Sequence, residues 1–213
     1  MSLQFLPVNN LNTQHFNDAI QIYLQSFPAN EQQPINTIKQ RVGEGREELY
    51  IGINNGIVVS MALLWHFSTI NFTLLDYFAV TEESRGKQVG SQFFHFLSGI
   101  ASCKGKHLVM EVESPTAESS SYDKVKRINF YLSNGAYILK DVPYTLPSLN
   151  GTHPTKMFLM VLPFNTSSVF SKQQVATLVT HLYIELYGKA INNLSLMELL
   201  QALPNQIELA VSI

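Results

Sequence analysis

The stretch LLDYFAVTEESRGKQVGSQFFHFL, residues 74–97, says more about the fold class than any other part of the chain. Residues 74–80 form an apolar run typical of a buried strand, and from Val89 onward the apolar residues recur with helical spacing. Between them lies a basic turn, Arg85–Ser91, that contains two glycines. Because unpaired N–H groups at a helix start and the helix dipole both favour negative charge, this turn predicts a pyrophosphate site. The alternative is an ordinary turn with solvated basic side chains.

The basic turn matches neither the Walker A pattern nor the glycine pattern of dinucleotide-binding proteins. Its meaning depends on the segments downstream of it in the chain. A strand is predicted at His107–Glu113, and the segment KRINFYLSNGA, residues 126–136, predicts a short helix that glycine ends.

Together these segments resemble the GNAT superfamily of acyl-CoA-dependent N-acyltransferases, over about residues 3–164. The phosphate loop of that family reads Q/R-x-x-G-x-G/A. Arg85 and Gly90 match its first and last fixed positions, whereas Gln88 stands where a middle glycine is usual. The later family signature, F-Y-x-x-x-G-A/F, is met by Phe130, Tyr131, Gly135 and Ala136.

The fold class expected from the resemblance is a mixed α/β sheet of GNAT type over residues 1–164, with a helical C-terminal extension, residues 165–213, packed on the domain or at a homodimer interface. Periodicity and turn signals agree with this expectation. The predicted strands are Gln4–Val8, Leu49–Ile53, Ile57–Trp65, Thr69–Val80, His107–Glu113, Ala136–Lys140 and Lys156–Pro163. The predicted helices begin near Thr13, Pro34, Val89 and Lys124, then in the extension near Val175 and at a capping box opened by Ser195.

The resemblance also implies a cofactor, acetyl-CoA or another short acyl-CoA, used as a co-substrate. Its pyrophosphate is expected on Arg85, Gly86, Lys87, Gln88, Val89, Gly90 and Ser91. Phe78 and Val80 are expected to act through the backbone, because the equivalent strand in GNAT proteins pairs with the pantetheine amides. Asn129 either contacts the pantetheine arm or faces solvent. No metal is expected.

Transfer of an acyl group to an amine needs a base for the ammonium and an acid for the departing thiolate. Glu111 and Glu113 lie two apart on one predicted strand, so they point to the same face. The family correspondence favours Glu111 over Glu113 as the base. The alternative is that both glutamates are solvated or ion-paired. Tyr131 is the expected acid, and a core tyrosine is the alternative. We expect direct attack in a ternary complex, because Cys103 has no evident activating base.

The acceptor is expected to be a small-molecule amine or a peptide amine. Tyr137, Tyr144 and Trp65 either form an aromatic wall for that amine or belong to the core. The acidic run that includes Glu47 and Glu48 is either a solvated charge cluster or a source of acidity for the amine pocket.

Composition agrees with a globular protein that has one good-sized core: 213 residues, 46% hydrophobic, 14% charged, with a formal net charge of −2. The near-neutral balance predicts neither nucleic acid nor membrane as a partner. There is no signal-like start and no apolar run of about 18 residues, so we expect a cytoplasmic enzyme.

Two readings without catalysis remain open on the sequence. One is a GNAT-like domain that binds acyl-CoA as a sensor, and the other is a nucleotide-binding module. Gln88 supports both, because a side chain at that position can crowd the phosphates of CoA.

Overall fold

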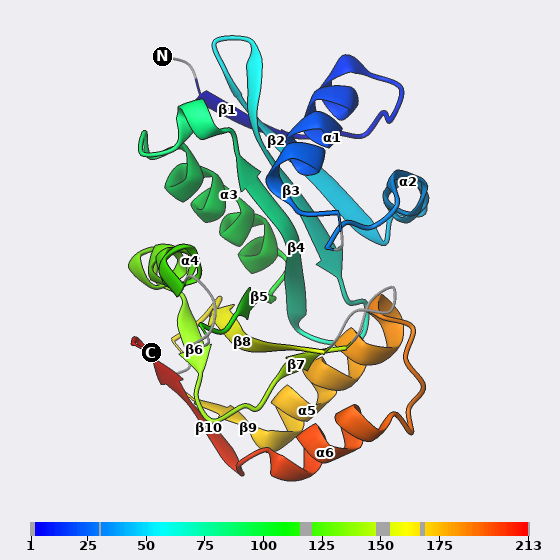
Figure 1. Cartoon of the computed structure of the whole chain (residues 1–213), viewed down its shortest axis with the longest axis vertical. Coiled ribbons are helices and arrows are strands. Elements are labelled where there is room, and N and C mark those ends of the chain that lie inside the picture. The colour runs from blue at the N-terminus through cyan, green and yellow to red at the C-terminus, as the bar shows by residue number, and fades with distance from the viewer. Residues whose placement is uncertain (1–2, 30, 116–120, 148–153, 167–168, 213) are drawn as a thin grey trace. The chain divides into compact units, whose positions relative to one another are not determined.

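The computed structural model describes residues 3–29, 31–115, 121–147, 154–166 and 169–212. The chain forms two compact units (Figure 1). Unit 1 comprises residues 1–68 and 73–104, and unit 2 comprises residues 69–72 and 105–213. Each unit is described by itself.

Unit 1 is built on a run of antiparallel strands in the order β1-β2-β3-β4. Its strands are β1 (Leu3–Pro7), β2 (Glu47–Asn54), β3 (Ile57–His66) and β4 (Phe72–Val80), and its helices are α1 (Gln14–Ser26), α2 (Ile35–Gly43), the short η1 (Glu82–Ser84) and α3 (Val89–Cys103). The predicted hairpin turn is present, with Asn55 and Gly56 at φ 51° and 82°. Positive φ at both positions is what a two-residue hairpin turn requires.

Helices cover both faces of these strands. Successive strand residues point to opposite sides, so neighbouring residues of one strand pack against different helices. Leu49 and Ile51 belong to the apolar core that β2 shares with α1 and α2. Tyr50 lies between them in sequence and contacts Phe96 of α3, with ring centroids 5.8 Å apart. The strand β2 therefore separates an α1/α2 face from an α3 face.

A β-bulge interrupts the pairing of β3 with β4. The register passes from Leu63 opposite Tyr77 to Leu64 opposite Leu75, which leaves Asp76 as the extra residue. Bulges often re-aim a side chain. Here Tyr77 packs against Tyr23 of α1, and Asp76 comes within 3.9 Å of Arg41 of α2, so both residues face α1 and α2.

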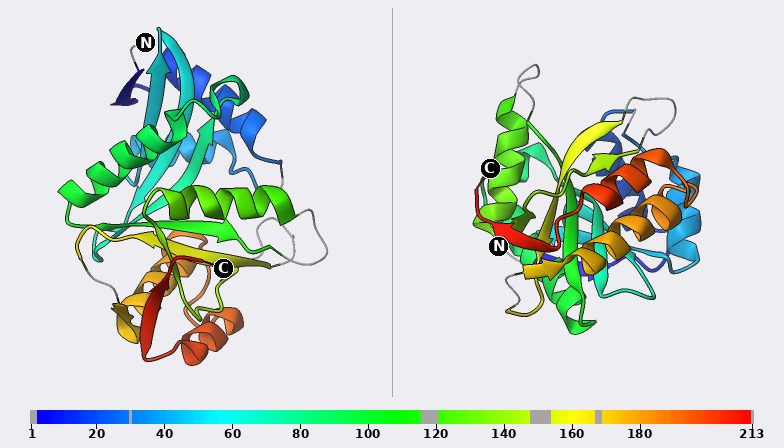
Figure 2. Two further views of the ribbon diagram at one scale, coloured as in Figure 1. Left: turned by 90° about the vertical axis from the view of Figure 1, so that its left-hand side faces the viewer. Right: turned by 90° about the horizontal axis from the view of Figure 1, so that it is seen from below.

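Unit 2 has strands paired antiparallel in the order β5-β8-β6-β10-β9, with β7 on β8. These strands are β5 (His107–Glu113), β6 (Tyr137–Leu139), β7 (Thr145–Leu146), β8 (Thr155–Leu162), β9 (Val169–Ser171) and β10 (Gln206–Ala210). The helices are α4 (Ser121–Ser133), α5 (Lys172–His181), a π-helical turn at Leu182–Leu186 and α6 (Leu194–Ala202). Figure 2 shows α5 and α6 side by side, next to the red strand β10.

Several predicted boundaries need correction. The strand predicted from Thr69 begins at Phe72. The extension contains helices, as expected, but also β9 and β10. The capping box is at Ser171 and Gln174, whereas α6 is capped by the Asn193 side chain rather than by Ser195.

The predicted division at residue 164 stays a prediction. In the structure, β10 of the extension pairs with β6, so the last strand shares a sheet with earlier strands of unit 2. Among the described residues, no helix is both long enough and apolar enough to span a membrane.

Candidate functional site

The basic turn in unit 1 joins β4 to α3. Arg85 turns back on the strand, where its Nε donates to the Val80 carbonyl over 3.3 Å. Gly86 has φ 72°, a left-handed conformation that glycine adopts at no steric cost. The side chains of Arg85, Lys87 and Gln88 are exposed.

The N-terminus of α3 has the features of an anion site. Gln88 is its N-cap, but in the part of the chain that the structure describes, the Gln88 side chain makes no capping hydrogen bond. No acidic residue occurs in the first turn of this described helix, and Val89 is buried beneath it. Gly90 and Ser91, both half-buried, complete the turn. Uncapped N–H groups beside basic side chains make a pyrophosphate a suitable ligand.

Gln88 has φ 63° and ψ 3°, which places it in the left-handed region. Glycine is favoured in this conformation, since a side chain there costs about 1–2 kcal/mol. Gln88 is therefore a residue with a side chain in a left-handed backbone conformation.

Phe78 and Val80 are half-buried on β4, where they pair with Ala62 and Ser60 of β3. The Phe78 ring stacks on Phe93 of α3 with centroids 5.6 Å apart. The Phe78 side chain thus packs on α3, and the pantetheine contact through its backbone stays a prediction.

In unit 2, two tyrosines hold the carboxylate of Glu111 on β5. The Tyr144 hydroxyl donates to Glu111 Oε1, and the Tyr187 hydroxyl donates to Oε2 over 2.5 Å. Tyr144 is 2% exposed. Burial, with the nearby Glu111 carboxylate, raises the Tyr144 pKa well above its usual value, so this phenol is a donor at neutral pH. The sequence predicts neither tyrosine contact, because the three residues are far apart along the chain.

Glu113 has different surroundings. Its Oε1 accepts from Lys124 Nζ of α4 over 2.6 Å. Glu113 is therefore ion-paired, which was the alternative to a catalytic role. Of the two glutamates, only Glu111 accepts hydrogen bonds from tyrosines among the described residues.

Tyr131 lies on α4 and is 7% exposed. Burial raises its pKa to about 12, against a smaller opposing effect of Arg127. Its ring meets Phe130 edge-on, with centroids 5.2 Å apart. The phenol therefore keeps its proton at neutral pH, as a general acid must. Asn129, two residues earlier, is exposed.

The α1/α2 face of unit 1 holds a buried polar cluster that the sequence did not predict. Its members are Arg41, Glu47, Trp65 and Asp76. The Arg41 guanidinium lies over the Trp65 ring, 5.2 Å from the centroid. Burial raises the pKa of Glu47 and of Asp76, and for Glu47 the neighbouring Asp76 adds to the effect. The one available signal was an aspartate inside the apolar run of residues 74–80.

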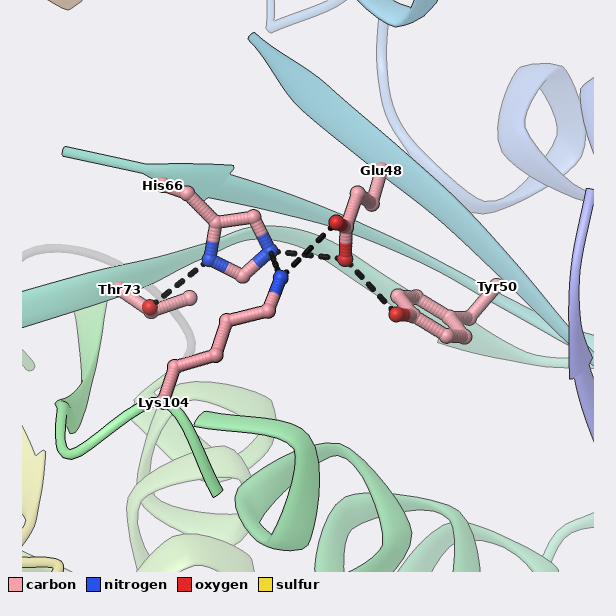
Figure 3. A network of polar contacts seen from close by, with 5 residues as sticks. All are labelled: Glu48, Tyr50, His66, Thr73 and Lys104. Atoms are coloured by element: carbon pink, nitrogen blue, oxygen red, sulfur yellow. Dashed lines mark hydrogen bonds and ion pairs between the residues drawn. The ribbon is translucent and has the colours of Figure 1, made fainter. Parts of the chain in front are cut away.

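The α3 face of unit 1 holds a second polar network (Figure 3). Glu48 Oε2 contacts His66 Nε2 at 2.8 Å and accepts from the Tyr50 hydroxyl at 2.7 Å. Lys104 Nζ is 2.8 Å from Glu48 Oε1 and 3.0 Å from His66 Nε2. Thr73 Oγ1 is 3.0 Å from His66 Nδ1. Hydrogen bonding by His66, then by Lys104 and Tyr50, holds the Glu48 pKa well below its usual value despite partial burial.

Among the described residues, no group of three or more His, Cys, Asp or Glu side chains is arranged to hold a metal ion.

The comparison with solved structures identifies the fold. No family model and no curated protein matches the chain. Among solved structures, a putative GNAT-family acetyltransferase from Bacteroides thetaiotaomicron is 22% identical over 88% of this chain and 99% of its own, with a TM-score of 0.73. The ribosomal-protein-S18-alanine N-acetyltransferase from Escherichia coli is 18% identical over 78% and 96%, with a TM-score of 0.55. A GNAT-family acetyltransferase from Elizabethkingia anophelis with acetyl-CoA bound is 16% identical over 76% and 97%, with a TM-score of 0.51.

The chain therefore has the GNAT fold, and the predicted mixed α/β class with a helix-containing C-terminal extension is confirmed.

Proposed function

We propose that the protein is an N-acetyltransferase that moves an acetyl group from acetyl-CoA to a primary amine. The observation that carries this proposal is the N-terminus of α3, with its left-handed Gly86 and Gln88 and exposed Arg85 and Lys87. The GNAT fold and the acetyl-CoA-bound neighbour support the same donor.

In this proposal the turn Arg85–Ser91 binds the pyrophosphate of CoA. The backbone of Phe78 and Val80 pairs with the pantetheine amides, and Asn129 contacts the pantetheine arm. We propose no metal, because acyl transfer from a thioester to an amine needs only proton transfers and charge stabilisation.

The chemistry is a direct attack of the amine nitrogen on the thioester carbonyl within a ternary complex. An alkylammonium of pKa about 10.4 costs roughly 4.6 kcal/mol to deprotonate at pH 7. Glu111 accepts that proton, directly or through water. The C–N bond forms as the C–S bond breaks, and Tyr131 donates its proton to the thiolate of CoA. The attacking nitrogen then releases its second proton, which restores the Tyr131 phenol through water.

An amine panel with acetyl-CoA, in which free thiol release is followed, tests activity and acceptor class together. The panel contains small amines, antibiotics and peptide N-termini, since a small-molecule or peptide amine is the proposed acceptor. Turnover with at least one class is expected. If none of the amines in the panel causes thiol release, the proposed reaction is contradicted.

Tyr131→Phe tests the proposed acid. We expect kcat to fall about 10–10³-fold with little change in CoA affinity, because only a transition-state interaction is removed. Tyr122→Phe is the matched control, since Tyr122 lies on the same helix and is 68% exposed. Equal kcat values for wild type and Tyr131→Phe would remove Tyr131 from the mechanism.

The second candidate is an acyl-CoA sensor without catalysis, favoured by the side chain of Gln88 in the phosphate turn. Calorimetry separates the possibilities. CoA is expected to bind much more tightly than ATP or NAD. The Gly90→Trp substitution is expected to lower the affinity for CoA. Gln88→Gly restores the family pattern at a left-handed position, so tighter CoA binding by this variant, together with an inactive wild type, would favour the sensor.

We also propose a cytoplasmic location, with neither nucleic acid nor membrane as a partner. A homodimer through the C-terminal extension is the one protein partner we propose, and sedimentation at several concentrations tests it.

A further inference from the structure

We infer that the C-terminal segment is a working part of the acyl-transfer site, in which Tyr187, together with Tyr144, positions the Glu111 carboxylate. The inference rests on the proposed role of Glu111 as the base. Tyr187 and Tyr144 are positioning residues, since they act through Glu111.

The first observation is that each oxygen of Glu111 has its own phenolic donor. Tyr144 donates to Oε1, and Tyr187 donates to Oε2. A carboxylate has about four lone-pair sites on its two oxygens, so two donors on different oxygens restrict its rotation. A base held in this way has one orientation toward the amine, which is what a near-attack geometry requires.

The second observation is that both donors are anchored by the backbone. The Tyr144 N–H donates to the Val142 carbonyl over 2.8 Å, and the Tyr144 carbonyl accepts from Met157 of β8 over 3.1 Å. The Tyr187 N–H donates to the Leu182 carbonyl over 3.1 Å, which closes the π-helical turn. Such turns occur frequently at functional sites.

The third observation is that the π-helical turn is fixed to the strands of unit 2. Leu182 and Tyr183 are fully buried, and the Tyr183 hydroxyl donates to the Thr145 carbonyl over 2.5 Å. The Tyr183 ring meets Tyr144 edge-on, with centroids 6.2 Å apart. The extension therefore supplies one donor to Glu111 directly and packs against the other.

Tyr187→Phe removes one phenolic donor and keeps the ring. We expect kcat to fall about tenfold, the size of effect typical of one hydrogen bond to a charged group. The acidic limb of the pH–rate profile is expected to move up by about one unit, because a carboxylate with fewer donors binds its proton more readily. The KM for acetyl-CoA is expected to stay within twofold.

Tyr183→Phe is the matched control, because Tyr183 belongs to the same turn and its hydroxyl binds a backbone carbonyl instead of Glu111. This variant is expected to leave the acidic limb in place. An unmoved limb in Tyr187→Phe, or an equal movement in Tyr183→Phe, would overturn the positioning role. If Tyr187→Phe melts before assay, Tyr144→Phe removes the donor to the other oxygen and is expected to move the limb the same way.

A second readout does not depend on activity. Carbon-13 NMR of the glutamate carboxyl groups follows the titration of Glu111 in wild type, Tyr187→Phe and Tyr183→Phe. The Glu111 midpoint is expected to rise in Tyr187→Phe only. If the wild type is inactive but the Glu111 midpoint shifts in Tyr187→Phe, the proposed reaction is contradicted and the positioning role stands. If the wild type is active but the midpoint does not shift, the positioning role is contradicted and the proposed reaction stands.

Discussion

Glu47 and Glu48 are consecutive residues of β2, yet the two faces of the strand give them opposite surroundings. Glu47 is 1% exposed on the α1/α2 face, and among the described residues neither of its carboxylate oxygens has a hydrogen-bond partner. Glu48 lies on the α3 face and is contacted by Tyr50, His66 and Lys104 (Figure 3).

The difference shows that burial and hydrogen-bond partners together decide whether a glutamate is charged. Burial and Asp76 favour a protonated Glu47 by raising its pKa. The donors around Glu48 lower its pKa and keep it ionised. Two consecutive residues of one strand thus present a neutral acid on one face and a carboxylate on the other, and four substitutions test this contrast.

Arg41→Met is expected to have the largest effect. It removes the guanidinium that lies 3.9 Å from the Asp76 carboxyl, and we expect the free energy of unfolding to fall by about 3 kcal/mol at pH 7. Urea unfolding measures it. Arg46→Met is the control, because Arg46 is half exposed and pairs with exposed Glu44, so a much smaller loss is expected. Similar losses in both variants would mean that the buried acids need no cation.

Glu47→Gln is expected to flatten the pH dependence of stability. Because the folded-state pKa of Glu47 lies above its usual value of 4.5, the folded protein holds a proton that the unfolded chain releases. Wild-type stability should therefore fall as the pH rises above about 4.5, by at most about 1.4 kcal/mol per pH unit. At pH 8 we expect the variant to be more stable by about 2 kcal/mol. Parallel stability curves from pH 5 to 8 would contradict the protonated state.

Glu48→Gln is expected to act in the opposite direction. The lowered pKa of Glu48 contributes stability that is present above pH 4.5 and is lost as the pH falls further. Since the side chain is 36% exposed, solvent screening reduces the contribution, and we expect a loss of about 1 kcal/mol at pH 7. The difference from wild type should shrink at pH 3. A constant difference at both pH values would indicate lost packing rather than lost charge.

Lys104→Gln is expected to have the smallest effect. Its Nζ pairs with Glu48 at the protein surface, so the loss should be no more than about 0.5 kcal/mol. Unfolding in 1 M salt should reduce the difference, because the Debye length there is about 3 Å, comparable to the distance between Nζ and Oε1. A difference that high salt leaves unchanged would show that the lysine stem contributes through packing.

Local signals determine much of the fold. The strand at His107–Glu113 and the start of α3 at Val89 have the bounds in the structure that the sequence predicts. Thr13 caps α1 through its side chain, where the helix is expected to begin. These features depend on turn chemistry, caps and periodicity over a few residues, which is why one sequence reveals them.

Contacts between distant segments are not predictable in this way. The pairing of β10 with β6 joins residues about 70 positions apart, and neither short strand has a distinctive pattern. The contact between Tyr187 and Glu111 spans 76 positions. The family resemblance marks Glu111, and Tyr144 is a candidate residue of the amine site, but the sequence does not show that Tyr144 and Tyr187 hold the Glu111 carboxylate.

Glu47 and Glu48 show where sequence information ends. The two-residue period of a strand already requires the two side chains to point to opposite faces, and the basic turn already predicts an anion site at the start of α3. Which of the two carboxylates is left without a hydrogen-bond partner among the described residues is decided only in three dimensions, where α2 packs on β2 and the end of α3 brings Lys104 to Glu48. Burial and hydrogen bonding depend on these neighbours, and the neighbours come from elements far away in the chain.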